Sequence, residues 1–539
     1  MNKNTLLRIL TAMVCIVLGM IIGQYLLYKN TDINKYIPIP VYYPQSELGK
    51  LQLVFEQIKE NYVDKVNIDS LVEKTIPFVL EELDPHSIYI QAEDMEQANE
   101  SIEGNFDGVG ITFNMPNDTV MVVSVVNGGP SERVGIHPGD RIITVDDSLI
   151  AGQKVSQNNV VRMLRGRTGT QVTVGIKRIG EPNLIYFPIT RNKIPVKSID
   201  VAYMINEHIG YVKLSKFSKS SHYEFLKAAL ALQEKGMKNL IFDLRSNTGG
   251  LLDQAFEIAN EFLPKESLIV YTEGRARKRQ DLYANGYGQL QHINVAILTD
   301  EFTASASEIV AGALQDNDRG LIVGLSTFGK GLVQEPINFS DNSGLRLTVA
   351  RYYTPTGRSI QKPYGKDKKY EEDIFQRILH GEFPEADSVK QDTIQRYTTP
   401  GGKIVYGGGG IAPDVLVPFL IDTTDVNEYF INVSKKNLIY RYAIQFSDLH
   451  RTEINNIHTI DSLRKFYTAF DLSKLFADYT ARQGVKPKPG ELKQCKHLID
   501  IYLKAFIGRN TPLDDEGFYP FIGAIDNTLL RAVEELERM

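Results

Sequence analysis

Two serines, Ser305 and Ser307, stand where an apolar segment gives way to an amphipathic one. Residues 294–298 are apolar after Asn294 and predict a short buried strand, and residues 303–308 (Thr-Ala-Ser-Ala-Ser-Glu) open a predicted helix. A serine at the N-terminal end of a helix lies beside free backbone N–H groups and the positive end of the helix dipole. Both can stabilise the oxyanion that develops when a serine attacks a carbonyl. The pattern therefore favours a serine nucleophile.

A lysine between two glycines follows this turn. Lys330 comes 25 positions after Ser305, in the run Thr-Phe-Gly-Lys-Gly at 327–331, and Gln334 comes four residues later. Together with Ser-Ala-Ser-Glu, this pattern resembles the carboxyl-terminal processing proteases, the tail-specific serine proteases of peptidase family S41 with a PDZ domain and a Ser/Lys dyad. The resemblance implies that Ser305 is the nucleophile, that Lys330 is its general base and that Gln334 orients the lysine.

A lysine can act as a base near neutral pH only when its pKa is lowered. The free ammonium has a pKa of about 10.4, so burial must disfavour its charged form. An apolar run at 320–325 precedes Lys330, and Phe328 and Leu332 flank it. A solvated surface charge is the alternative for any single lysine. The serine motif at matching spacing favours the buried base.

Other catalytic classes leave no comparable motif. Nine histidines leave a Ser-His-Asp triad open by count, but no Gly-x-Ser-x-Gly elbow surrounds a serine. No His-Glu-x-x-His motif is present, which disfavours a metalloprotease. We expect neither a metal nor an organic cofactor. Ser307 is interpreted as a supporting residue, and Glu308 as a residue that caps or orients the helix.

A second turn has the residue types of an oxyanion site. Residues 240–244 predict a strand, and the run Asp-Leu-Arg-Ser-Asn-Thr-Gly-Gly at 243–250 leads from it to a helix. Paired glycines let the backbone approach a substrate closely. In the processing proteases the Asn-x-Gly-Gly turn supplies one oxyanion N–H, and the resemblance places it at Gly250, with the second donor at Ala306. A simple helix-starting turn is the alternative.

A glycine-containing loop precedes these motifs in the chain. Gly108, Val109, Gly110 and Ile111 occupy the place of the Gly-Leu-Gly-Phe loop of PDZ domains. Glycines there let consecutive backbone N–H groups turn inward to hold a C-terminal carboxylate. The predicted helix at 158–164 forms the other wall of the peptide groove. A nucleotide-binding loop is rejected, because no Lys-Ser/Thr follows and no βαβ unit surrounds the glycines.

The N-terminal segment predicts a membrane anchor. Residues 6–27 are almost uncharged after Arg8 and about twenty residues long, as a bilayer-spanning helix with a basic cytoplasmic flank requires. A cleaved signal peptide is the alternative, but no small-x-small site follows. We therefore expect an inner-membrane anchor with the catalytic part in the periplasm, or secretion to the periplasm after cleavage. The two cysteines, Cys15 and Cys495, do not identify the compartment.

Length and composition indicate a multidomain globular protein of 539 residues, 42% hydrophobic and 23% charged. The net charge of −6 gives no reason to expect nucleic acid as a partner. With the resemblance, the pattern predicts an α/β protease core, a mixed sheet with helices of the ClpP/crotonase-like kind, with an inserted mostly-β PDZ domain and helical N- and C-terminal regions. The expected divisions are a cytoplasmic tip and anchor (1–28), a linker (29–46), an N-terminal helical region (47–99), the PDZ domain (100–192), the protease core (193–418, with an insertion at 362–406) and a C-terminal helical extension (419–539).

The two helical regions carry no catalytic signal of their own. Leu-Asp-Pro-His-Ser at 83–87 breaks the N-terminal helical pattern, and the same Leu-Asp-Pro-x-Ser sequence precedes the PDZ domain in the processing proteases. His86 within it is interpreted as a capping or packing residue. Aromatic stripes at 466–479 and 499–506 indicate a core or a subunit interface, so we expect a homodimer as one outcome. The extension resembles that of the longer Bacteroidetes-type members of the family.

The sequence thus predicts a serine endopeptidase that recognises and cleaves extracytoplasmic proteins near their C-termini through an acyl-enzyme. Its substrates are expected to be proteins or peptides with free, poorly folded C-termini. The alternative from another class is a catalytically silent PDZ scaffold that binds C-termini, which the intact Ser305, Lys330 and Gln334 disfavour. A second alternative is a housekeeping peptidase for short peptides, with the PDZ domain only as a gate.

Overall fold

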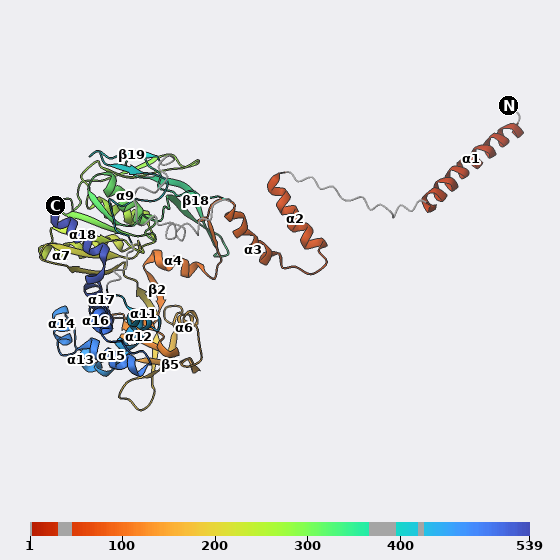
Figure 1. Cartoon of the computed structure of the whole chain (residues 1–539). Coiled ribbons are helices and arrows are strands. Elements are labelled where there is room, and N and C mark those ends of the chain that lie inside the picture. The colour runs from red at the N-terminus through yellow and green to blue at the C-terminus, as the bar shows by residue number, and fades with distance from the viewer. Residues whose placement is uncertain (1–2, 31–45, 366–394, 419–424) are drawn as a thin grey trace. The chain divides into compact units, whose positions relative to one another are not determined.

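The computed structural model describes residues 3–30, 46–365, 395–418 and 425–539 (Figure 1). Contacts within the chain divide it into two units, Met1–Thr75 and Ile76–Met539. The first unit contains α1 (Lys3–Asn30) and α2 (Glu47–Asn61), and α3 (Ile68–Glu81) begins in the first unit and ends in the second. Most of the predicted linker (29–46) and most of the predicted insertion (362–406) lie outside the described residues.

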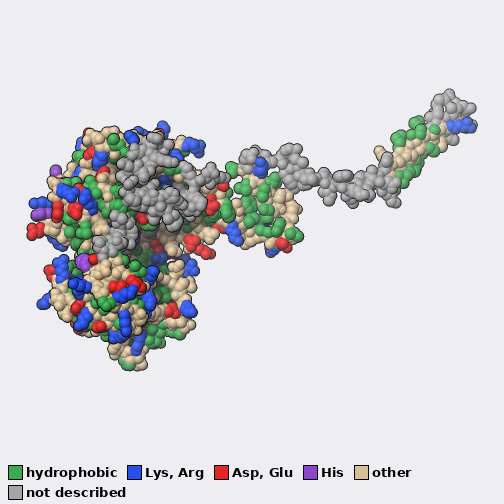
Figure 2. All heavy atoms as spheres, viewed as in Figure 1, with side chains coloured by type: hydrophobic (Ala, Val, Ile, Leu, Met, Phe, Trp, Pro, Cys, Tyr) green, Lys and Arg blue, Asp and Glu red, His purple; other side chains and the backbone are tan. Residues whose placement is uncertain are grey.

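Helix α1 covers the segment that the sequence indicated as a membrane anchor. Within the described residues, however, no helix is both long enough and apolar enough to cross a bilayer. The expectation of an inner-membrane anchor is therefore not supported. Leu48 and Leu51 of α2 are exposed. Figure 2 shows hydrophobic and charged side chains on one face of the molecule.

The second unit is built on a six-stranded sheet in the order β10-β11-β12-β15-β16-β21. Its strands are β10 (Ile199–Met204), β11 (Ile209–Leu214), β12 (Asn239–Asp243), β15 (Asn294–Thr299), β16 (Gly320–Gly324) and β21 (Val415–Leu416). β10 is antiparallel to β11 and all other neighbours are parallel, so β11 to β21 have their carboxyl ends at one edge. This mixed sheet confirms the predicted α/β core.

Helices cover both faces of this sheet. Successive residues of a strand point to opposite faces, so each central strand contributes side chains to two cores. Leu240 and Phe242 of β12 pack in one core with α7 (Ser221–Glu234), α8 (Leu252–Asn260) and α9 (Ala306–Asp316). Ile241, between them, packs in a second core with α18 (Asn527–Arg538). Because both faces are buried, the strands appear in the sequence as continuous apolar runs.

A second, antiparallel sheet continues the core. It contains β1 (Ile88–Ile90), β13 (Leu268–Glu273), β14 (Gln280–Tyr283), β17 (Leu332–Asn338) and β18 (Gly344–Tyr353), and a separate pair is formed by β19 (Arg396–Thr398) and β20 (Ile404–Tyr406). β17 and β18 pair along their length as a hairpin. Since β17 begins two residues after Lys330, this hairpin fixes the direction of the lysine-bearing loop.

A mostly-β domain is inserted between α4 (Met95–Glu103) and β10. Its sheet has the order β3-β4-β5-β7-β8, with β6 paired to β5. The elements are β3 (Ile111–Asn114), η2 (Pro116–Asp118), β4 (Val120–Val125), α5 (Pro130–Arg133), β5 (Arg141–Val145), β6 (Ser148–Leu149), α6 (Gln157–Leu164), β7 (Gln171–Lys177) and β8 (Ile185–Thr190). The chain enters through β2 (Asn105–Gly108) and leaves through β9 (Asn192–Pro195), and these two strands pair as a ribbon. Val196 N–H then donates to the Gly104 carbonyl (2.8 Å).

The C-terminal extension is helical, as predicted. It contains α11 (Glu428–Lys435), α12 (Leu438–Leu449), α13 (Arg451–Asn455), α14 (Ile460–Tyr467), α15 (Leu472–Arg482), α16 (Glu491–Arg509), α17 (Asp515–Ile522), η4 (Gly523–Ile525) and α18. Phe466 and Phe476, expected on one stripe, lie on separate helices because Asp471 caps α15 by accepting the Lys474 N–H (3.4 Å). Both pack into a core within the chain, so the stripes give no support to the expected homodimer.

The extension contacts both the inserted domain and the sheet. Ile444 of α12 packs against Met121 and Val123 of β4. At the other end, the carboxylate of Asp526, which caps α18, pairs with Arg245 (2.7 Å). The extension therefore bridges the inserted domain and the strand that leads to the glycine turn.

Candidate active site

Ser305 lies at the turn between β15 and α9 and is the N-cap residue of the helix. Its backbone has φ +56° and ψ −114°, a conformation that non-glycine residues rarely adopt. Two contacts hold it: the Ser305 N–H donates to Glu308 Oε2 (2.8 Å), and the Tyr352 hydroxyl donates to the Ser305 carbonyl (3.1 Å). The helix consequently begins at Ala306, three residues later than the sequence indicated, and Ser305 is only half-buried.

Lys330 lies in the loop after β16, the strand next to β15. Its Nζ donates to Gln334 Oε1 on β17 (3.0 Å). Gln334 Nε2 donates in turn to the carbonyl of His86. Burial lowers the pKa of Lys330, because a desolvated ammonium is disfavoured. The lysine and the glutamine that the sequence grouped together are therefore in contact.

The serine turn and the lysine loop share two buried partners. Glu308 Oε2 accepts the Ser305 N–H (2.8 Å) and the Lys330 N–H (2.9 Å). The Tyr352 hydroxyl contacts the carbonyls of Ser305 and Lys330. In the described part of the chain, no hydrogen bond joins Ser305 Oγ directly to Lys330 Nζ. Ser305 and Lys330 are thus held through their backbones by the same two side chains, while Lys330 Nζ contacts Gln334.

The glycine pair lies directly against the serine turn. A Cβ at Gly249 would stand 2.8 Å from Ser305 Cβ, so no larger residue fits there unless the turn moves. Gly250 has φ +145°, and a Cβ on it would come 2.1 Å from the Phe217 carbonyl oxygen. Among the described residues, the N–H groups of Gly250 and Ala306 have no acceptor. Two such donors beside a serine are what a developing oxyanion requires.

Asn247 connects the two turns, a role that sequence reasoning missed. Its carbonyl accepts the Ala304 N–H and the Ser307 hydroxyl, both at 3.0 Å. Its side chain accepts the Gly249 N–H (2.9 Å) and donates to the Leu214 carbonyl (2.9 Å). The spacing Asn-x-Gly-Gly was the available signal. The supporting role expected of Ser307 agrees with this contact.

His86 lies beside the lysine loop. Its carbonyl accepts from Gln334, and its ring meets Phe328 edge-on with centroids 6.4 Å apart. Burial, with a smaller contribution from the charge of Lys330, lowers the pKa of His86 to about 4, so the ring is neutral at pH 7. Asp84 fixes this turn by accepting the His86 N–H (2.8 Å). The interpretation as a packing residue fits the ring, but the backbone contact with Gln334 was not anticipated.

The predicted tail-binding loop joins the ribbon to the first strand of the inserted sheet. Gly108 ends β2, and Ile111 begins β3. Gly110 has φ +75°, which favours glycine, and the buried Val109 accepts the Ser131 hydroxyl at its carbonyl (2.7 Å). In the described structure β3 pairs with β4 alone, so its other edge is free to pair with an added strand.

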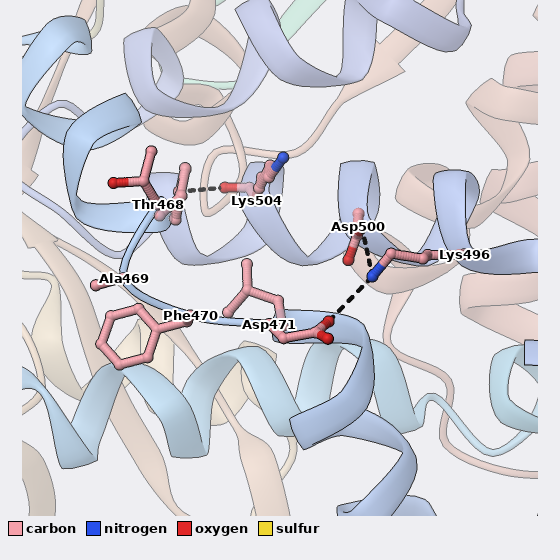
Figure 3. A pocket seen from close by; sticks show the side chains of 9 residues that line it. Thr468, Ala469, Phe470, Asp471, Lys496, Asp500 and Lys504 are labelled. Atoms are coloured by element: carbon pink, nitrogen blue, oxygen red, sulfur yellow. Dashed lines mark hydrogen bonds and ion pairs between the residues drawn. The ribbon is translucent and has the colours of Figure 1, made fainter. Parts of the chain in front are cut away.

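A separate pocket lies among the C-terminal helices (Figure 3). It is lined by Asp471 from the α14–α15 connection and by Lys496, Asp500 and Lys504 from α16. Lys496 donates to Asp471 Oδ1 (3.0 Å) and pairs with Asp500 (3.5 Å), so its charge is balanced. None of the candidate catalytic residues lines this pocket. The candidate active site is instead at the sheet edge.

Three comparisons show which known proteins this chain is similar to. Residues 208–374 match peptidase family S41, residues 108–186 match the PDZ domain, and residues 429–511 match a family of unknown function. A carboxy-terminal-processing protease of Bartonella bacilliformis is 38% identical over 320 residues, 58% of this chain and 73% of the relative. A CtpA-like serine protease of Staphylococcus aureus is 34% identical over 354 residues, 65% of this chain and 68% of the relative. The solved photosystem II D1 C-terminal processing protease is 25% identical, covering 68% of this chain and 92% of that one, with a TM-score of 0.35.

The fold and the matched segments define a serine-type peptidase with an inserted PDZ domain. Because more than two thirds of the Bartonella relative is covered at 38% identity, the family is established. The chain belongs to the carboxy-terminal-processing proteases of peptidase family S41. The family and the fold class predicted from the sequence are thereby confirmed.

Proposed function

We propose that the protein cleaves other proteins near their C-termini, with Ser305 as the nucleophile and Lys330 as the general base. The observation that carries this proposal is the 3.0 Å hydrogen bond between Lys330 Nζ and Gln334, in a loop that Glu308 ties to the serine turn. A lysine whose ammonium form is disfavoured by burial is suited to accept a proton.

These contacts support the following reaction. Neutral Lys330 takes the proton from Ser305 Oγ as the oxygen attacks the peptide carbonyl, and Gln334 keeps Nζ in place. The C–N bond breaks when the ammonium returns the proton to the leaving amine, which leaves an ester on Ser305. Water then attacks the ester and gives its proton to Lys330. The ammonium passes this proton to Ser305 Oγ as the ester bond breaks, which releases the new carboxyl terminus and restores the serine and the neutral lysine. Because the first step needs neutral lysine, kcat/KM rises with pH through the lowered pKa of Lys330.

The oxyanion is proposed to lie between the N–H groups of Gly250 and Ala306. Gly250→Ala is expected to lower kcat/KM by at least about 10²-fold, because the new Cβ must displace the turn that carries the N–H. Peptide cleavage rates measure this effect. Gly402→Ala is the matched control, since Gly402 also has a positive φ (+89°) but a Cβ there meets open space. Equal activity of the two variants would remove Gly250 from the oxyanion site.

The PDZ loop at Gly108, Val109, Gly110 and Ile111 is proposed to hold the free carboxylate of the substrate tail, which would then extend along β3. The free edge of β3 and the positive φ of Gly110 support this proposal. Both features suit an added strand whose terminal carboxylate accepts backbone N–H groups.

An unfolded reporter protein with a free C-terminus is expected to be cleaved about 10- to 100-fold faster than the same reporter with an amidated C-terminus. The factor corresponds to the loss of hydrogen bonds to a charged group. Both reporters are incubated with the protein and with Ser305→Ala, and fragments are quantified over time. Equal cleavage of both reporters would favour the housekeeping peptidase. Tail binding without cleavage would favour the scaffold.

We also propose that the substrates are extracytoplasmic, because carboxy-terminal-processing proteases are typically periplasmic. Digestion of intact spheroplasts by an added protease tests this: the catalytic core should be degraded without lysis.

The domain division at 100–192, 193–418 and 419–539 is retained as part of the proposal. Separate hydrophobic cores in the inserted domain and in the extension support it.

A further inference from the structure

Glu308 is a fully buried carboxylate between the serine turn and the lysine loop, with an exposed fraction of 0%. Its Oε2 accepts the N–H groups of Ser305 (2.8 Å) and Lys330 (2.9 Å). Its Oε1 accepts the Gly329 N–H (2.7 Å) and the Thr327 hydroxyl (2.5 Å). One side chain therefore contacts both loops that carry the proposed nucleophile and base.

All four partners of Glu308 are hydrogen-bond donors. The Thr327 hydroxyl donates because its oxygen already accepts the Ile411 N–H (2.7 Å). A carboxylate accepts hydrogen bonds on both oxygens. A neutral acid or an amide would instead point one of its own hydrogens at one of the four donor groups, and that hydrogen bond would be lost. Burial raises the pKa of Glu308 to about 7, while its four donors favour the charged form. The arrangement is thus satisfied only by the anion.

The charge of Glu308 also acts on the lysine. The charged groups that face Lys330 are Glu308 from α9, Asp84 from the turn before β1, and Arg346 from β18. His86 lies on the same side and is neutral at pH 7. Glu308 and Asp84 raise the pKa of Lys330, opposing the effect of burial, and the Glu308 contribution is the larger of the two.

We propose that Glu308 is a positioning residue for the peptidase reaction: its carboxylate sets the placement of Ser305 relative to Lys330, and its negative charge sets the pH at which Lys330 becomes a base. This inference rests on the proposed function. It goes beyond helix capping, because a cap needs only the Ser305 N–H, whereas three further bonds hold the segment at 327–330.

The test compares Glu308→Gln and Glu308→Asp with the parent protein over a range of pH. In Glu308→Gln the amide turns its NH₂ toward donors, and we expect kcat to fall about 10²-fold with KM unchanged, as for a misplacement of about 1 Å. The acid limb of the kcat profile is expected to move to lower pH, because Lys330 loses a charge that stabilised its ammonium. Glu308→Asp keeps the negative charge on a side chain that is one methylene shorter. We therefore expect kcat to fall while the acid limb of the kcat profile moves little.

Glu224→Gln is the matched control. Glu224 also accepts two backbone N–H groups, of Ser198 (2.7 Å) and Ile199 (3.2 Å), but it does so on α7 rather than at the serine turn. Its kcat and its acid limb are expected to match those of the parent. Circular dichroism establishes that each variant is folded, and if Glu308→Gln does not fold, the kcat of Glu308→Asp decides.

Two results separate this inference from the function on which it rests. If Ser305→Ala and Lys330→Ala are inactive while both Glu308 variants keep the parent kcat and acid limb, the inference is wrong and the proposed function stands. If Glu308→Gln loses kcat without any movement of the acid limb, the electrostatic part of the inference is wrong. If Ser305→Ala retains activity, the proposed function itself fails.

Discussion

Replacing Ser305 by Ala is expected to lower kcat/KM for a tail-bearing reporter by at least about 10⁴-fold. Without Oγ the proposed acyl-enzyme cannot form, and the proposed oxyanion donors and the PDZ domain are left only to bind the substrate. Lys330→Met is expected to cause a loss of the same order, because Ser305 then has no base at neutral pH. As the two residues act as a unit, the double variant should be no less active than either single variant.

The stability of Lys330→Met tests the burial of Lys330 independently of its role in catalysis. The pKa of Lys330 is lower in the folded than in the unfolded protein, so stability falls as pH decreases from above about 10.4 toward the folded-state pKa, and the deficit persists below it. Lys330→Met removes this deficit. The variant is therefore expected to unfold at higher urea concentration than the parent at pH 7, and the difference should vanish above about pH 11.

Ser340→Ala is the control for the dyad, since Ser340 is an exposed serine in the turn between β17 and β18. It should cleave the reporter at the parent rate. Equal cleavage by Ser305→Ala, Lys330→Met and the control would mean that another nucleophile is at work. Loss of cleavage with Lys330→Met but a lower resistance to urea would contradict burial as the origin of the lowered pKa.

Replacing Arg358 by Met is expected to lower the free energy of unfolding of the protease core by about 3–5 kcal/mol. Arg358 and Asp316 are both fully buried and form an ion pair (2.6 Å) between the C-terminal end of α9 and the turn after β18. The guanidinium also donates to Gln315 Oε1 (2.7 Å) and the Tyr406 carbonyl (2.9 Å). Removing it leaves the Asp316 carboxylate charged in the core.

Urea unfolding followed by circular dichroism measures this effect. The double variant Arg358→Met/Asp316→Leu should recover most of the lost stability, because neither charge then remains buried. Arg277→Met serves as control, since its ion pair with Glu335 is exposed and screened by water. If Arg358→Met were as stable as this control, the buried pair would not stabilise the core.

The grouping of the candidate site could be predicted because it follows from topology. The glycine turn, the serine turn and the lysine loop come after β12, β15 and β16, which are adjacent and parallel. Parallel neighbours end at the same edge, so three motifs far apart in the sequence meet there. Apolar runs followed by small or polar residues are sufficient to recognise such an edge.

The residues that hold the site in place could not be predicted, because their partners are distant in sequence. The carbonyl of Asn247 accepts the Ser307 hydroxyl 60 positions away, and Tyr352 reaches the Ser305 carbonyl across 47 positions. Local patterns contain no signal for such pairings. The helix start was misplaced for the same reason, since Glu308 and Tyr352 hold Ser305 at a positive φ that keeps it outside α9.

Two expectations drawn from hydropathy are not supported by the described structure. The apolar run at 6–27 suggested an anchor, yet no helix in the described ranges is long and apolar enough to cross a bilayer. In the extension, 3.6-residue periodicity suggested a continuous stripe, but Asp471 interrupts it as an N-cap. Periodicity reports which side chains are buried, whereas capping groups decide where each helix ends.

Because β2 and β9 pair as a ribbon, the PDZ domain is connected to the protease core at a single place and can be replaced as a unit. Asn105 pairs with Pro195, and the Val196 N–H donates to the Gly104 carbonyl, so the chain leaves and re-enters the protease core at adjacent positions. A module whose two ends meet can be replaced without changing the spacing of the host. In this protein a grafted module must keep the surface of Met121 and Val123 that packs on the extension. A domain exchange at this ribbon would therefore replace the PDZ domain while leaving the chain of the protease core unchanged.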